Sequence, residues 1–171
     1  MRKKLIFALL MMFLIALFCL IPYRNAVVFY KDRPQEILAF APLIQNQSFQ
    51  IKYIHSIHLS PVVETYEGTS LNEIRQTELM YEDFAIGMPS EAEEEEKFVQ
   101  ADGKYYIKNM NRIFPYIYLR VGEVKANHTV IIDDKAIPMT TFTEAGSVIK
   151  IQVSKLSIFD QWKGVNIIVC L

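Results

Sequence analysis

The sequence has few of the features that would point directly to a chemistry. It holds two cysteines among 171 residues, Cys19 in an apolar run and Cys170 next to the C-terminal residue, so we expect no disulfide framework. No stretch reads G-x-S-x-G, the turn that presents a nucleophilic serine in many hydrolases. No charge dominates either, since 18 basic residues meet 19 acidic ones. We expect no nucleic-acid binding, because that requires clustered Lys and Arg.

The longest hydrophobic run covers residues 5–21 and follows Arg2, Lys3 and Lys4. A basic start followed by an apolar run is typical of a segment that the export machinery handles. No small-x-small cleavage site follows the run, and its length is at the short end of the roughly 17–25 residues that span a bilayer. We therefore predict an uncleaved signal anchor over residues 1–25, a single-pass location in the cell membrane and an extracytoplasmic domain over residues 26–171. A cleaved signal peptide is the alternative.

From residue 26 onward, short runs of β-branched and aromatic residues alternate with turn residues. These runs predict strands over residues 27–30, 36–40, 49–55, 62–67, 71–81, 97–101, 104–108, 115–121, 129–133, 148–154 and 165–170. Asp102-Gly103 gives the strongest signal for a tight hairpin. Helix is expected only near residues 90–97 and 155–163. The spacing predicts an all-β fold, a single antiparallel β-sandwich or barrel-like domain after an N-terminal transmembrane helix.

Residues 113–121 predict a strand with two apolar faces. The odd positions are aliphatic, and the even positions carry Phe114, Tyr116 and Tyr118 before Arg120. Either another layer covers the aromatic face, or it is exposed as a binding surface.

Residues 53–66 concentrate the polar side chains that could carry chemistry. They include two of the three histidines, His55 and His58, together with Ser56 and Glu64. The alternation from residue 49 places His55 in a row of apolar side chains, and Pro61 marks a turn before Glu64. We predict that His55 and Glu64 approach closely enough to hydrogen-bond, which would satisfy two costly buried groups. Such a pair can hold a fold together or present a site.

The candidate binding site is a polar cluster of His55, Ser56, His58, Glu64 and His128. Imidazole and carboxylate groups suit zinc, yet two histidines three residues apart on a continuous strand point to opposite faces. Serine beside histidine in sequence does not establish a catalytic triad, which is a geometric arrangement. We therefore predict no catalytic residue, no metal and no cofactor, and we regard an enzyme as the less favoured class. The alternative is a metal-dependent or His/Glu-based hydrolase at the cell surface.

The chain resembles the family called domain of unknown function 1850. The resemblance lies in Tyr53-Ile54-His55-Ser56, in Ser60-Pro61-Val62-Val63-Glu64-Thr65-Tyr66, in Gly87-Met88-Pro89 and in residues 122–128. It covers roughly residues 48–169. The family has no established activity. The resemblance therefore implies that His55, Ser56, Pro61 and Glu64 belong to the family's motif, and it assigns them no chemical role.

The resemblance also implies a context for the protein. Members of that family are small bacterial proteins with an N-terminal signal or anchor, often encoded beside tripartite (TRAP-type, TAXI subclass) solute transporters. We therefore expect an uncharacterised, membrane-anchored accessory module of such a transporter. Its expected partners are the membrane and the transporter subunits, and the small-molecule solute is unknown.

Overall fold

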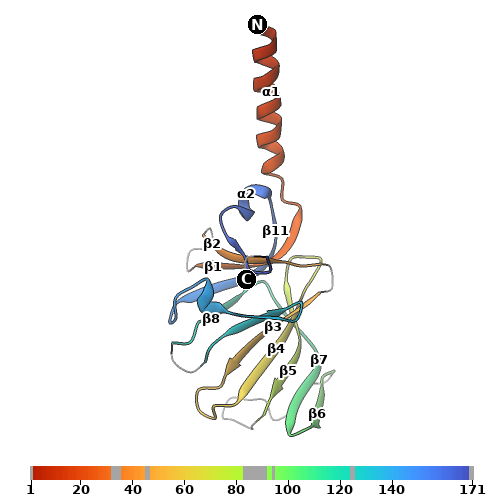
Figure 1. Cartoon of the computed structure of the whole chain (residues 1–171). Helices are drawn as coiled ribbons and strands as arrows, with labels where there is room; N and C mark the ends of the chain where they lie inside the picture. The colour runs from red at the N-terminus through yellow and green to blue at the C-terminus, as the bar shows by residue number, and fades with distance from the viewer. Residues whose placement is uncertain are drawn as a thin grey trace.

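The computed structural model describes residues 2–31, 36–44, 47–82, 92–93, 95–123 and 126–169. In these ranges one long helix precedes a domain made mainly of strands (Figure 1). The elements are α1 (Arg2–Cys19), β1 (Arg24–Lys31), β2 (Ile37–Pro42), β3 (Ser48–Ile54), β4 (Pro61–Gly68), β5 (Ile74–Tyr81), β6 (Lys97–Ala101), β7 (Lys104–Phe114), β8 (Ile117–Arg120), β9 (Thr129–Ile132), β10 (Lys135–Pro138), the 3-10 turn η1 (Met139–Thr141), β11 (Val148–Leu156), α2 (Ile158–Gln161) and β12 (Val165–Asn166).

The strands form two sheets. The five-stranded sheet has the order β12-β2-β1-β11-β8, and the seven-stranded sheet has the order β10-β9-β3-β4-β5-β7-β6. Neighbouring strands are antiparallel in both sheets, except that β12 pairs with β2 in parallel. The predicted mainly β, antiparallel-rich class is confirmed. In the described part of the chain neither sheet closes into a barrel, since each has two edge strands.

One large apolar core joins the two sheets. From residue 148 to residue 154 of β11 the odd positions Ile149, Ile151 and Val153 are buried and the even positions are partly exposed, as the period of two predicts. These side chains cluster with Phe49 and Ile51 of β3, which belong to the other sheet. Burial of this face is the main favourable contribution to folding, at about 25 cal/mol per Å² of apolar surface.

The hairpin predicted at Asp102-Gly103 is confirmed between β6 and β7. Both turn residues have positive φ, 52° for Asp102 and 74° for Gly103. A two-residue turn that matches the right-handed twist of the flanking strands requires this conformation. A Cβ added at Gly103 would meet no atom within 4 Å, so only the backbone conformation demands glycine there.

We expect Gly103→Ala to lower the free energy of unfolding by about 1–2 kcal/mol, the cost of a left-handed conformation for a residue with a Cβ. Denaturant unfolding measures this. Asp102→Asn is the control, because asparagine tolerates positive φ, and it should change stability by less than about 0.5 kcal/mol. An equal loss in both variants would contradict this account of the turn.

Several predicted boundaries differ from the structure. Strand β5 begins at Ile74, because residues 69–73 form the turn after β4, and β12 is only two residues long. The short strand β10 was not predicted. Helix α2 lies in the predicted region and starts with a capping box, in which Ser157 and Asp160 bond each other's backbone. Residues 90, 91 and 94 of the other predicted helix lie outside the described residues, and the described positions from 92 to 97 are not helical.

Residues 113–121 do not form one strand, because β7 ends at Phe114 and β8 begins at Ile117. Phe114 packs against the core that joins the sheets, whereas the two tyrosines that follow it are exposed. Tyr116 is 42% and Tyr118 55% accessible, and their rings meet edge to face at 5.2 Å. The ammonium of Lys150 lies 4.5 Å from the centre of the Tyr116 ring. Each of the two alternatives therefore holds for part of this face, since the core covers Phe114 and leaves Tyr116 and Tyr118 uncovered.

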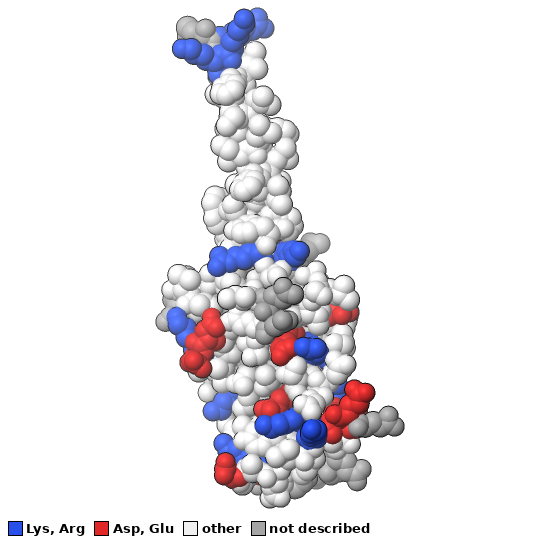
Figure 2. All heavy atoms as spheres, turned by 90° about the vertical axis from the view of Figure 1, so that its right-hand side faces the viewer, with Lys and Arg blue, Asp and Glu red and all other residues white. Residues whose placement is uncertain are grey.

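Helix α1 stands clear of the sheets (Figure 1) and has no buried residue. Figure 2 shows a surface without charged side chains along the helix, between the basic side chains at its N-terminal end and others beyond its C-terminal end. No helix in the described ranges is long and apolar enough to cross a membrane. The first three of the 18 residues in α1 are basic, and residues 5–19 rise only about 22 Å at 1.5 Å per residue, against a hydrocarbon core of about 30 Å. The predicted transmembrane helix, and the single-pass cell-membrane location based on it, are therefore wrong.

Candidate functional site

Glu64 lies on the side of the seven-stranded sheet that faces the core. It is directly opposite Ile51 of β3 and Leu79 of β5, both of which are buried. On its own strand it lies between Val62 and Tyr66, which belong to two different apolar clusters. An acidic side chain thus occupies the boundary between two parts of the apolar face.

Tyr66 supplies a partner for this carboxyl. Its hydroxyl donates a hydrogen bond to Glu64 Oε2 over 2.8 Å, and its ring stacks on Phe49 with 5.6 Å between ring centres. The stacking fixes the tyrosine ring, so the hydroxyl is held in place for the carboxyl. No other hydrogen bond of the Glu64 side chain occurs in the described part of the chain. The other oxygen, Oε1, is not fully buried, so solvent can reach it.

Burial dominates the electrostatics of this group. It raises the pKa of Glu64 above the usual 4.5, and the Tyr66 hydrogen bond offsets part of that rise. Burial, and then the nearby Glu64 charge, raise the pKa of Tyr53 to about 12. The same two causes raise the pKa of Tyr66 further still. Both tyrosines therefore keep their protons at neutral pH and act as hydrogen-bond donors.

His128 stands beside Tyr53 at the same end of the sheet. Its ring stacks on the Tyr53 ring with 5.4 Å between centres, and its Nδ1 accepts a hydrogen bond from the Gly122 amide over 3.0 Å. Burial lowers the pKa of His128 below 6.5. The imidazole is therefore neutral at pH 7 with its proton on Nε2, because Nδ1 acts as an acceptor.

The turn after β3 carries the remaining predicted site residues. His55 closes this turn through its backbone, which bonds Ser60 and Leu59, and its Nδ1 accepts a bond of 3.4 Å from the Ile57 amide. The His55 and His58 rings are 5.7 Å apart. Ser56 and His58 are exposed, and His55 is half-buried.

The predicted hydrogen bond between His55 and Glu64 does not form. The strand register pairs Ile54 with Pro61 and Ile51 with Glu64, so the carboxyl lies about 10 Å along the sheet from the turn that carries His55, at about 3.3 Å per residue. Each group has another partner, Tyr66 for Glu64 and the Ile57 amide for His55. The prediction of this pair is wrong.

The five predicted residues thus fall into three places rather than one cluster. Glu64 lies between β3 and β5, His128 stacks on Tyr53, and the other three residues lie in the turn after β3. In the part of the chain that the structure describes, no three His, Cys, Asp or Glu residues are grouped so as to hold a metal ion.

Comparison with known proteins identifies the family. A family model described as "Domain of unknown function (DUF1850)" matches residues 49–139. The chain belongs to the DUF1850 family. No curated protein and no solved structure matches the chain.

The DUF1850 match runs from β3 to β10 and so takes in all strands of the seven-stranded sheet. It contains Glu64, both tyrosines near it, and His128. The strands β1, β2, β11 and β12 of the other sheet lie outside it. The matched region therefore contains the sheet that carries the candidate site, together with β8 of the other sheet.

Sequence reasoning missed Tyr53 and Tyr66 as members of the site. Their signal was present, since Tyr66 is two residues after Glu64 and shares its face of the strand. Tyr53 lies across from Val62 on the same face. A search restricted to histidine, serine and acid overlooked the hydroxyls that bond or adjoin the carboxyl.

The raised pKa of Glu64 predicts a pH dependence of stability. Below pH 4.5 the carboxyl is protonated in both the folded and the unfolded state. As pH rises, the unfolded chain releases this proton first, so stability falls until the pH has passed the raised pKa of the folded state. We expect wild type to lose stability relative to Glu64→Gln over this window. Urea unfolding of both proteins between about pH 4 and pH 8 measures it. Parallel curves, or a difference of opposite sign, would contradict the direction of the shift.

Proposed function

We propose that this DUF1850 protein is a non-enzymatic binding module, built as a β-sandwich, that acts as an accessory protein of a tripartite solute transporter. The half-buried carboxyl of Glu64 is the observation that carries the proposal. One of its oxygens bonds Tyr66 and the other has no hydrogen bond within the described residues.

The chemistry of this carboxyl favours a cationic partner group. A carboxylate in a partly dry setting attracts a guanidinium or ammonium more strongly than one in water. Tyr53 and Tyr66 add aromatic rings at the same place, and such rings also attract cations. We infer that an Arg or Lys side chain of a transporter subunit bonds Glu64 Oε1.

The hydrolase alternative has less support. General acid or base chemistry with His55 and Glu64 would need the two groups within hydrogen-bond reach. Their bonding partners are instead Tyr66 and a backbone amide. His128 is engaged by Gly122 and Tyr53.

The partner class rests on the gene neighbourhood that the resemblance to the family implies, with transporter genes often beside the gene of a family member. Co-purification tests it. Tagged full-length protein, expressed with the neighbouring transporter genes, is expected to bring down the transporter subunits in stoichiometric amounts. Recovery no greater than that with an unrelated tagged protein would refute the proposal.

A further inference from the structure

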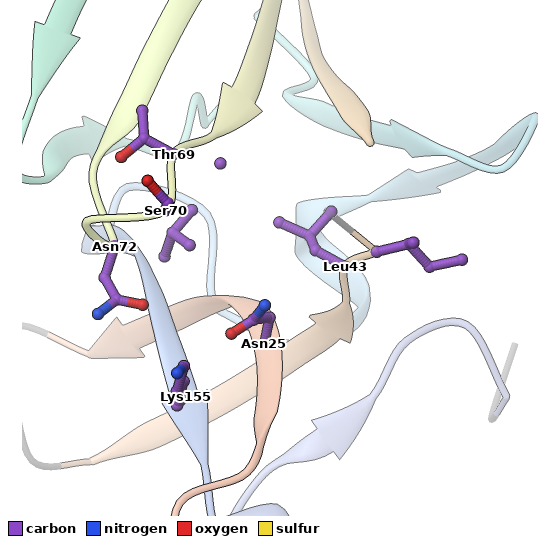
Figure 3. A pocket seen from close by; sticks show the side chains of 9 residues that line it. Asn25, Leu43, Thr69, Ser70, Asn72 and Lys155 are labelled. Carbon is purple, nitrogen blue, oxygen red and sulfur yellow. The ribbon is translucent and has the colours of Figure 1, made fainter. Parts of the chain in front are cut away.

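A pocket of about 200 Å³ opens between the two sheets at the end of the domain from which α1 departs (Figure 3). It lies away from Glu64. On one side are the ends of β1 and β11, and on the other is the turn that joins β4 to β5. Sites for drug-sized ligands hold roughly 300–1,000 Å³, so this volume suits a smaller molecule.

Two polar residues line the side formed by the five-stranded sheet. Asn25 and Lys155 are register partners on β1 and β11. Asn25 lies two residues before Val27 and Lys155 lies two residues after Val153, so both are on the core-facing side of their strands. They lie just beyond the apolar core cluster, which contains the two valines. The apolar row therefore becomes polar at the pocket, and Lys155, an exposed residue, is part of its lining.

The β4–β5 turn supplies hydroxyl and amide groups on the other side, from Thr69, Ser70 and Asn72 (Figure 3). Thr69 holds the turn, because its Oγ1 accepts bonds from the Leu71 and Glu73 amides. Its hydroxyl proton is left to donate elsewhere.

The polar side chains of the pocket have unused bonding capacity. In the part of the chain that the structure describes, Lys155 has no ion pair, and the side chains of Asn25, Ser70 and Asn72 make no hydrogen bond. None of the described residues that line the pocket is acidic. One positive charge and several donors thus face a common space without a counter-charge.

An apolar wall completes the pocket. Leu43, Ile44 and Val153 line it, and a Cβ added at Gly68 would come within 3.2 Å of Val153 and 3.5 Å of Leu43. This glycine lets the turn approach the aliphatic side chains closely. A ligand in the pocket therefore meets polar side chains from both the five-stranded sheet and the β4–β5 turn, and aliphatic side chains along the remaining wall.

We propose that the pocket binds a small monocarboxylate with a short aliphatic part. The single ammonium balances one negative charge, the amide and hydroxyl groups bond the carboxylate oxygens, and the aliphatic part packs on Leu43 and Val153. This site is separate from Glu64, so it stands whether or not the transporter proposal does.

Isothermal titration of the full chain with butyrate, inorganic phosphate and butylamine tests the proposal. We expect butyrate to bind saturably, phosphate more weakly and butylamine not at all. Lys155→Met keeps the length of the side chain and removes its charge, and it should weaken butyrate binding at least about tenfold. Lys52→Met is the matched control, because Lys52 is an exposed strand lysine away from the pocket.

Three results would overturn the proposal. They are the absence of saturable butyrate binding, phosphate binding tighter than butyrate, and equal loss in Lys155→Met and Lys52→Met. Thermal unfolding of each variant shows that it is folded. Asn25→Ala provides a second variant should Lys155→Met fail to fold, and it is also expected to weaken butyrate binding.

Discussion

Ile51→Ala should lower the free energy of unfolding by about 2–5 kcal/mol, the cost of a cavity at a fully buried aliphatic side chain. Ile51 is 0% exposed and lies in β3, an interior strand of the seven-stranded sheet, between Glu64 of β4 and Val130 of β9. Its side chain belongs to the core that joins the two sheets. The loss should therefore affect the whole domain rather than one hairpin.

Ile113→Ala is the matched control for this change. Ile113 is also a strand isoleucine, on β7, but 45% of its surface is exposed. The same truncation should cost less than about 1 kcal/mol there. Denaturant unfolding of both variants gives the comparison. Equal losses would contradict the shared core, because they would mean that the two sites are equally buried in solution.

Glu64→Gln is the second change with a large expected effect, and the effect is on binding. The glutamine carbonyl can still accept the Tyr66 hydrogen bond, and the substitution removes a charge whose burial raises the Glu64 pKa. Stability should therefore stay within about 1 kcal/mol of wild type. Attraction for a cationic partner group is lost with the charge. The amount of transporter that co-purifies should fall at least tenfold, the loss expected when a charge-assisted bond is removed.

Glu78→Gln serves as the control for binding. Glu78 is on the neighbouring strand β5 and turns to the opposite face, where its carboxylate lies 3.5 Å from Lys108. An exposed ion pair of this kind contributes about 0–1 kcal/mol. Co-purification with Glu78→Gln should equal that with wild type. Loss of the transporter in both variants would indicate a general charge effect and contradict the role of Glu64.

The strand content was predictable because alternation and turn residues are local signals. Val148 to Ser154 and the Asp102-Gly103 turn show this, since each needs only a few neighbouring residues to specify its structure. Strand β10 was missed because Pro138 and Lys135 weaken its propensity, and pairing with β9 overrides that weakness. The transmembrane prediction counted the apolar run to residue 21, whereas the helix ends at Cys19.

The candidate site was predicted less well, because it depends on register. Parity along the strand correctly places Glu64 on the apolar face, but parity cannot say how far along the partner strand it lies. The β3–β4 register puts the carboxyl opposite Ile51 rather than beside His55. His128 reaches Tyr53 only through the tertiary fold, which no sequence spacing reports.

The most direct test of the proposed function is solute uptake by cells whose only copy of this protein carries Glu64→Gln. Uptake should fall to the rate of cells without the protein, while the purified variant keeps a melting temperature within a few degrees of wild type. Glu78→Gln cells should take up solute normally. Normal uptake by the Glu64→Gln cells would contradict the proposal, and so would a variant that loses uptake only because it unfolds.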